Sequence, residues 1–266
     1  MARSKRARRF SGWRRQRVVS ACILLAITLW TLSSIGESNK NAPGKEKDSG
    51  QTVDSGTFGV FMNGRRMGTE SFSIAQNSNG SVITSDFKSE GSSDQAAQSA
   101  ELRLEPNGNI RAYEWRELSP GRAHAEVVPN DNFLVERATS NPEQKPFEQP
   151  FLLPSSTNIL DDYFFIDREV LAWKYLAIAC HQEKGQLNCP VNQPTQFGAL
   201  DPHSRSSMQI SMQFSKREMV PVHGAPRDLL RFDLNVEGDD WALWLDDSLK
   251  LVRIVNASQN TEVVRD

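Results

Sequence analysis

Two of the three cysteines are placed so that they could react with each other. Cys180 and Cys189 bound the segment CHQEKGQLNC, and an even pair in an exported domain is most simply a disulfide. A redox-active pair normally has two intervening residues rather than eight. A zinc site of Cys180, His181 and Cys189 would have two adjacent donors, which does not match structural zinc spacing. The sequence therefore predicts a disulfide, which would contribute on the order of 2 to 3 kcal/mol for a loop of about ten residues.

The histidines form no recognisable catalytic pattern. The chain has four: His124, His181, His203 and His223. No serine lies in a G-x-S-x-G nucleophile elbow, which is the sequence mark of one large hydrolase class. His203 follows Pro202 and His223 lies close to Pro221, so both are expected in loops and in contact with solvent. We therefore predict no catalytic residue from the histidines.

Paired carboxylates are a second candidate for catalysis. They occur at Asp161-Asp162, Asp239-Asp240 and Asp246-Asp247. Glycosidases use two carboxyl groups at a set distance, but adjacent residues on a strand point to opposite faces. The first pair is expected to begin a helix, where anions favour the helix dipole, and the others are expected in turns. The sequence predicts no catalytic dyad, no metal site and no cofactor. Convergence of two of these histidines and carboxylates in one buried pocket would revive the hypothesis of an enzyme.

Apolar side chains are the remaining candidates for a binding site. Trp241 and Trp244 lie on opposite faces of a segment that is apolar on both sides. One interpretation is a central strand covered by a helix. The other is a concave apolar pocket, in which flexible methionines suit variable hydrophobic ligands. Its predicted wall is Met208, Ile210, Met212, Phe214, Trp241 and Trp244, and its predicted lid is Phe164, Phe165 and Trp173.

These residues must be positioned by a sheet, because most of the chain alternates between apolar and polar positions. From residue 57 onward this period of two is interrupted by turn residues every 8 to 12 positions, as in antiparallel strands with one buried face. Asn63-Gly64 and Asn79-Gly80 are typical of tight hairpin turns. The fold class expected is mainly β: a large curved antiparallel sheet or open half-barrel of about eleven strands.

One segment has the pattern of a helix. Residues 160–179, LDDYFFIDREVLAWKYLAIA, contain no Gly or Pro and begin with the acidic pair Asp161-Asp162. Their apolar positions form a broad stripe, which indicates a helix lying across the sheet. Strands, one helix and further strands, without a repeated βαβ unit, favour an antiparallel sheet with one covering helix.

The N-terminus has the organisation of an export signal or membrane anchor. Residues 1–17 contain eight basic side chains and no acidic ones, and residues 18–36 are almost entirely apolar or small. Such a segment is either a cleaved signal peptide or a single membrane span with its positive end in the cytoplasm. Residues 37–55 are polar and are expected to be a flexible linker, and residues 56–266 form the exported β domain.

The N-terminal segment and the remainder of the chain carry opposite net charges. Without residues 1–17, the chain has 23 basic and 33 acidic residues, a net charge of −10. An acidic body repels nucleic acid, so no nucleic-acid partner is expected. We expect the protein to cross the inner membrane once, with its C-terminal domain in the periplasm. If the N-terminal segment is cleaved, we expect it to be secreted to the periplasm.

Several segments together resemble a group of uncharacterised exported bacterial β-proteins of acidobacterial type. They are TFGVFMNGRRMGTESFSI, AELRLEPNGNIRAYEW, FLLPSSTNILDDYFF, WLDDSLKLVRI and NTEVVR, and the likeness covers about residues 58–265. This group is more distantly similar to the lipoprotein-carrier superfamily. That likeness implies an open half-barrel of about eleven antiparallel strands capped by helix, which often holds a lipid or acyl chain. Such carriers usually have more than one helical lid element, whereas one helix is evident here. The resemblance implies no catalytic residues.

Three functions follow as hypotheses. The first is an exported or membrane-anchored module that binds a lipid or another hydrophobic ligand in the half-barrel. The alternative is an envelope structural or protein-interaction domain with a filled core, whose protein partner is unknown and would dock at an edge strand. The third and weakest is a hydrolase.

Overall fold

The computed structural model describes residues 50–91, 95–141, 143–184 and 186–266. The described residues form one helix, α1 (Ile166–Ala179), and seventeen strands. The strands before the helix are β1 (Gln51–Met62), β2 (Arg65–Asn77), β3 (Gly80–Ser89), β4 (Ala97–Leu104), β5 (Ile110–Ser119), β6 (His124–Asn130), β7 (Phe133–Thr139), β8 (Phe147–Phe151) and β9 (Asn158–Ile159). Those after it are β10 (His181–Glu183), β11 (Gln186–Asn188), β12 (Thr195–Asp201), β13 (Ser206–Val222), β14 (Ala225–Val236), β15 (Asp239–Leu245), β16 (Leu251–Asn256) and β17 (Thr261–Arg265).

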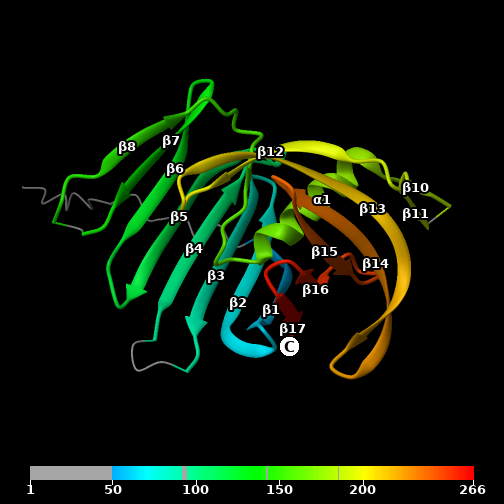
Figure 1. The fold of residues 1–266 in the computed structure, drawn as a ribbon. Helices are drawn as coiled ribbons and strands as arrows, with labels where there is room; N and C mark the ends of the chain where they lie inside the picture. The colour runs from blue at the N-terminus through cyan, green and yellow to red at the C-terminus, as the bar shows by residue number, and fades with distance from the viewer. Residues whose placement is uncertain (1–49, 92–94, 142, 185) are drawn as a thin grey trace, which may run out of the picture. The chain divides into compact units, whose positions relative to one another are not determined.

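Fifteen of the strands form one open sheet that curls around α1 (Figure 1). Its order is β8-β7-β6-β5-β4-β3-β2-β1-β17-β16-β15-β14-β13-β12-β9. Every pair is antiparallel except β9 with β12. The first and last strands in the sequence, β1 and β17, pair with each other at the middle of the sheet. The sheet therefore has two arms, which we call the N-terminal arm (β1–β8) and the C-terminal arm (β12–β17 with β9). The prediction of a mainly β, open antiparallel sheet with one helix is confirmed.

Tight turns explain the register of the first hairpins. Asn63 and Gly64 have φ values of 51° and 72° and join β1 to β2. Gly80, at φ 130°, begins β3, and a Cβ added there would lie 1.9 Å from the carbonyl oxygen of Leu104. Asn-Gly pairs adopt such conformations with little strain, so the turns predicted from these pairs are present.

The prediction of about eleven strands is wrong, since the described residues contain seventeen. Most of the additional strands have five residues or fewer, such as β8, β9, β10 and β11. Alternation cannot be recognised over two or three residues. These elements are determined by tertiary pairing, as where β9 bonds to β12.

Two predicted boundaries also differ. The helix begins at Ile166 rather than near residue 160, and Phe165 is its N-cap. Asp161 lies outside the helix because its carboxylate is bonded to groups from the sheet. The strand β1 begins at Gln51, within the residues expected to be linker, because Asp54 forms a buried ion pair with Arg265.

The main hydrophobic core lies between the inner face of the sheet and α1. It combines both arms and the helix, with Phe58, Leu171, Tyr175, Met212 and Phe232 fully buried. The helix therefore occupies the concave side of the sheet and is part of the core.

A second, smaller hydrophobic cluster lies on the opposite, outer face of the C-terminal arm. Trp244, Val252 and Val264 contribute to it from β15, β16 and β17. The far end of the β13–β14 hairpin reaches the same cluster through Val220, and His223 at its tip bonds the carbonyl of Arg265 at 2.7 Å. The long hairpin thus folds back over the outer face.

The predicted segments 1–17 and 18–36 lie outside the described residues. Among the residues that are described, no helix has the length and hydropathy needed to cross a membrane.

Candidate functional site

The turn after β12 brings the C-terminal arm onto the inner face of the N-terminal arm. Residues 202–205 form this turn, and its conformation is fixed by Asp201, whose Oδ1 accepts the backbone N–H of His203 at 2.9 Å. His203 then reaches Gln98 on β4, and Arg205 reaches Glu136 on β7. We call the group Gln98, Tyr113, Glu136, Asp161, Asp201, His203 and Arg205 the seam cluster.

His203 is held from both ring nitrogens. Its Nδ1 lies 2.7 Å from Asp161 Oδ2 and its Nε2 lies 2.9 Å from Gln98 Oε1. The ring stacks on Trp115 with centroids 4.0 Å apart and planes at 19°. Its side chain is only 16% exposed, so the prediction of a solvated loop histidine is wrong. The reason is the turn at Asp201, which directs the His203 side chain onto the N-terminal arm. No short sequence motif predicts this turn.

Asp161 is fully buried and holds the cluster together. Its Oδ2 also accepts the hydroxyl of Tyr113 at 2.5 Å, and its Oδ1 accepts the backbone N–H of Tyr163 at 2.8 Å. Burial, with the nearby carboxylate of Asp161, raises the pKa of Tyr113 well above its usual value. The expectation that Asp161 begins the helix is therefore wrong, since this side chain is engaged by β5 and by the turn after β12.

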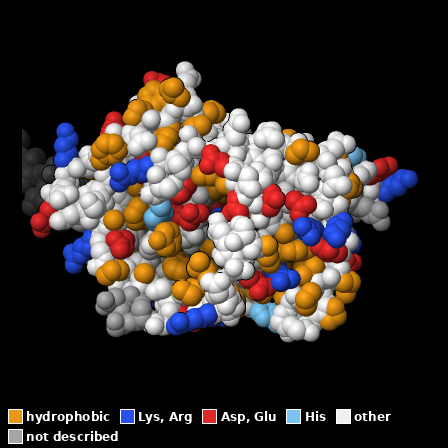
Figure 2. Space-filling view, viewed as in Figure 1, with side chains coloured by type: hydrophobic (Ala, Val, Ile, Leu, Met, Phe, Trp, Pro, Cys, Tyr) orange, Lys and Arg blue, Asp and Glu red, His pale blue; other side chains and the backbone are white. Residues whose placement is uncertain are grey.

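The seam cluster contains more buried carboxyl groups than cations. Glu136 points to the inner face of β7, is 1% exposed, and has no hydrogen-bond partner on either oxygen; its ion pair with Arg205 is 3.7 Å long. Burial raises the pKa of Glu136 to about 7. On the molecular surface, Figure 2 shows acidic side chains across the middle of one face.

A second group of buried charged side chains connects strands β1 and β17 to the helix. Arg265, at the end of β17, donates to Asp54 of β1 at 2.5 Å and to Glu169 of α1 at 3.1 Å. Lys250 lies 2.8 Å from the same Asp54. Burial alone would raise the pKa of Asp54, but the bonds from Arg265 and other groups hold it well below its usual value. Burial raises the pKa of Glu169 to about 9.

The helix is attached to the sheet along its whole length. At its start, the carboxylate of Glu70 on β2 accepts the backbone N–H groups of Phe165 at 2.8 Å and Ile166 at 3.1 Å. Farther along, Trp173 Nε1 donates to the carbonyl of Leu249 at 2.6 Å. Burial raises the pKa of Glu70 to about 7.

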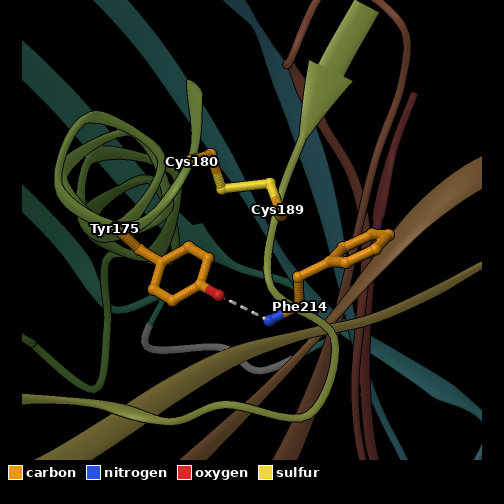
Figure 3. Close-up of a disulfide and its surroundings, with 4 residues drawn as sticks. All are labelled: Tyr175, Cys180, Cys189 and Phe214. Carbon is orange, nitrogen blue, oxygen red and sulfur yellow. Dashed lines mark hydrogen bonds between the residues drawn. A yellow bond between two sulfur atoms is a disulfide. The ribbon is translucent and has the colours of Figure 1, made fainter. Parts of the chain in front are cut away.

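The end of the helix carries the disulfide (Figure 3). Cys180 and Cys189 are bonded, which agrees with the disulfide predicted from the sequence. In the same region the backbone N–H of Phe214 donates to the hydroxyl of Tyr175 at 3.0 Å. The helix terminus is therefore connected covalently to the chain that leads into β12.

The residues predicted to form a lipid pocket lie mostly within the main hydrophobic core. Ile210, Met212, Trp241, Phe164 and Phe165 are buried there, and Met208, Phe214 and Trp173 are partly buried against it. The predicted wall and lid already touch, since the rings of Trp241 and Phe165 lie 6.4 Å apart. Trp244 is separated from the set, in the outer-face cluster.

An outer-face groove of about 500 Å³ lies beside Trp244. Its lining is mixed, with Arg231, Asp233 and Asp240 around Ala242. The guanidinium groups of Arg231 and Arg253 lie 5.5 and 5.3 Å from the indole ring. Trp241 also lines the groove, which presents polar and apolar groups in about equal measure and is not a purely apolar pocket.

The seam cluster, by contrast, brings together groups with metal-binding chemistry. Asp161, Asp201 and His203 each offer one ligand atom, and these atoms lie within 4.8 Å of one another. The sequence analysis did not identify this group because His203 is 42 residues from Asp161. The two side chains come into contact only when the N-terminal and C-terminal arms pack together in the folded domain. Both ring nitrogens of His203 are already bonded, which argues against a free general base.

The described residues form an open, mainly β domain with one helix on the concave side of its large sheet. No known protein-family profile matches the chain, and no curated protein matches it. It is similar to a solved structure described as a β-barrel-like protein of domain of unknown function DUF1849 from Brucella abortus. The TM-score is 0.50 at 10% identity, over 80% of this chain and 94% of the other. At this identity the likeness concerns the fold alone, and it extends neither to the acidobacterial group nor to the lipoprotein carriers.

Proposed function

We propose that the protein is an exported envelope domain with a filled core, acting as a structural or protein-interaction module rather than as a carrier of lipid. The observation that carries this proposal is that α1 occupies the concave side of the sheet, where a carrier would hold its ligand. Fully buried Leu171 and Tyr175 of α1 pack there with Met212 and Phe232.

The attachments of α1 support the same conclusion. Opening the concavity would break the bonds of Glu70 to the first turn of the helix and the bond of Trp173 to Leu249. It would also leave the Glu169 carboxyl group without Arg265 in a buried place. Each lost buried hydrogen bond costs about 1 to 3 kcal/mol, so a ligand would have to offset several at once.

The two edge strands of the sheet are poorly suited to pairing with a strand of a partner protein. The edge strand β8 contains Glu148 and Pro150, and the opposite edge β9 has two residues. Charges, proline and short edge strands protect a sheet from adding foreign strands. The earlier idea of a partner docking at an edge strand is therefore less favoured than docking on a face.

Membrane attachment through residues 18–36 and an extracytoplasmic location remain part of the proposal. The disulfide supports the extracytoplasmic location, because such bonds persist mainly in oxidising compartments. Thiol labelling tests this location. Cells are lysed in N-ethylmaleimide, and the chain is then denatured without reductant. We expect Cys180 and Cys189 to react with N-ethylmaleimide only after the disulfide is reduced. Full labelling before reduction would contradict export.

Lipid analysis tests the filled core. The full chain is purified from its native membrane in detergent, exchanged against vesicles of phosphatidylethanolamine and phosphatidylglycerol, and repurified. Mass spectrometry of organic extracts should find no stoichiometric lipid beyond that of a detergent-solubilised control protein. One specific lipid per chain would overturn the proposal in favour of a carrier.

A cavity variant serves as the matched positive control. Leu171→Ala removes a buried side chain of α1 and should leave an apolar cavity, at a cost of about 2 to 5 kcal/mol. Such cavities bind benzene, so benzene should raise the melting temperature of Leu171→Ala but not that of the native chain. An equal rise in both would reveal a cavity in the native core.

A further inference from the structure

We propose that Asp161, Asp201 and His203 form a binding site for one divalent transition-metal ion at the seam between the two arms. The three donors come from different parts of the chain: the segment before α1, the end of β12 and the turn that follows it. Two carboxylates and one imidazole form a mixed oxygen and nitrogen set, which suits ions such as Zn²⁺ and Mn²⁺.

The hydrogen bonds around the donors have the arrangement of an outer ligand shell. Gln98 Oε1 lies 2.9 Å from His203 Nε2 and can accept a hydrogen bond from Nε2–H, which leaves Nδ1 to act as a ligand. The hydroxyl of Tyr113 and the backbone N–H of Tyr163 orient the carboxylate of Asp161. Metal-ligating histidines and carboxylates are commonly held by such partners.

The contact between His203 Nδ1 and Asp161 Oδ2 requires either a hydrogen-bonding proton or a metal ion between the two atoms. The two atoms are 2.7 Å apart, and two lone pairs at that distance repel unless a proton or a cation lies between them. A proton satisfies this contact alone, whereas a divalent ion would replace the proton and also neutralise Asp201. Metal–ligand bonds of about 2.0 to 2.2 Å require only a modest separation of the two atoms.

A further buried carboxyl group beside the same turn is an independent observation that favours a cation site. Glu136 is 1% exposed on the inner face of β7, and neither of its oxygens has a hydrogen-bond partner. The turn of His203 reaches it through Arg205, at 3.7 Å. Buried unpaired carboxylates are costly, and a divalent ion at the seam would offset the excess negative charge.

Calorimetric titration of the tag-free full chain with ZnCl₂, and separately with MnCl₂, after treatment with chelator, tests the site. We expect one ion per chain. Replacing an outer-shell partner by Gln98→Ala should weaken binding about 10-fold to 100-fold, and His203→Gln or Asp201→Asn at least as much. His181→Gln, which changes an exposed histidine, is the matched control and should bind as the native chain does.

A second measurement keeps the test independent of how the variants fold. Mn²⁺ broadens nuclear resonances close to it, and the Trp115 indole ring stacks on His203. At one equivalent of Mn²⁺, the Trp115 indole signal should broaden before that of Trp244 in the outer-face cluster. Absence of one-to-one binding, unchanged affinity in folded His203→Gln, or broadening elsewhere first would each overturn the proposal.

Discussion

At the scale of single residues, the Tyr113 hydroxyl is the buried donor that satisfies Asp161. Tyr113→Phe removes this hydrogen bond and leaves the carboxylate oxygen with one partner fewer. We expect a loss of about 1 to 3 kcal/mol in the free energy of unfolding, measured by urea denaturation. Tyr163→Phe is the matched control, because Tyr163 is partly exposed and should cost less than about 0.5 kcal/mol. Equal losses in both variants would contradict a special role for Tyr113.

Glu169 predicts how stability depends on pH. Its folded-state pKa is raised to about 9 by burial, whereas the unfolded chain releases this proton near pH 4.5. The folded state therefore keeps this proton up to a higher pH than the unfolded state does. The free energy of unfolding should fall as the pH rises from about 5 toward 9. Glu169→Gln imitates the protonated form, so the native chain should lose stability relative to this variant by on the order of 1 kcal/mol per pH unit.

Urea denaturation at pH 5.5, 7 and 8.5 measures this difference. Glu148→Gln, at an exposed position on β8, should leave the pH dependence unchanged. Parallel pH profiles of the native chain and Glu169→Gln would show that Glu169 is ionised in the folded state.

The sequence predicted residue chemistry only where that chemistry is local. Cys180 and Cys189 are close in sequence, and their disulfide was predictable from spacing and number. His203, Asp161 and Gln98 are brought together by the turn after β12, so no local pattern indicated them. The buried position of Asp161 was missed because an acidic residue before a helical pattern usually caps the helix.

At the scale of elements, the disulfide connects the end of α1 to the chain that enters β12. Cys180→Ser combined with Cys189→Ser should lower the free energy of unfolding by about 2 to 3 kcal/mol, as expected for closing a loop of about ten residues. Thermal unfolding with and without reductant checks this value. The double variant should be insensitive to reductant, and a native chain equally insensitive would contradict a structural disulfide.

Long elements were predictable and short ones were not. The alternation of Ile210 with Met212 and of Phe232 with Leu234 marks inner-face positions that are buried in β13 and β14. Strands such as β9 have too few residues for any periodicity. The helix start was misplaced because its N-terminal N–H groups are satisfied by Glu70, a residue nearly a hundred positions earlier, rather than by a local cap.

At the scale of the whole described domain, Arg265 connects β17 to β1, where the two arms of the sheet meet, and to α1. It bonds Asp54 and Glu169, and its guanidinium group lies 5.4 Å from the Phe58 ring. Arg265→Met leaves buried carboxyl groups without their main cation, which typically costs about 3 to 5 kcal/mol. Arg137→Met, which removes an exposed ion pair with Glu148, should cost less than about 1 kcal/mol. Urea denaturation of both variants compares the two losses.

The central claim is that α1 is a permanent part of the core and not a lid. Hydrogen exchange of the full chain, with and without phosphatidylglycerol vesicles, tests it most directly. We expect the amides of Ile166–Ala179 to exchange as slowly as those of β1 and β16, with the same protection when vesicles are present. Exchange of the helix well before the sheet, or selective loss of its protection on adding vesicles, would contradict the filled core.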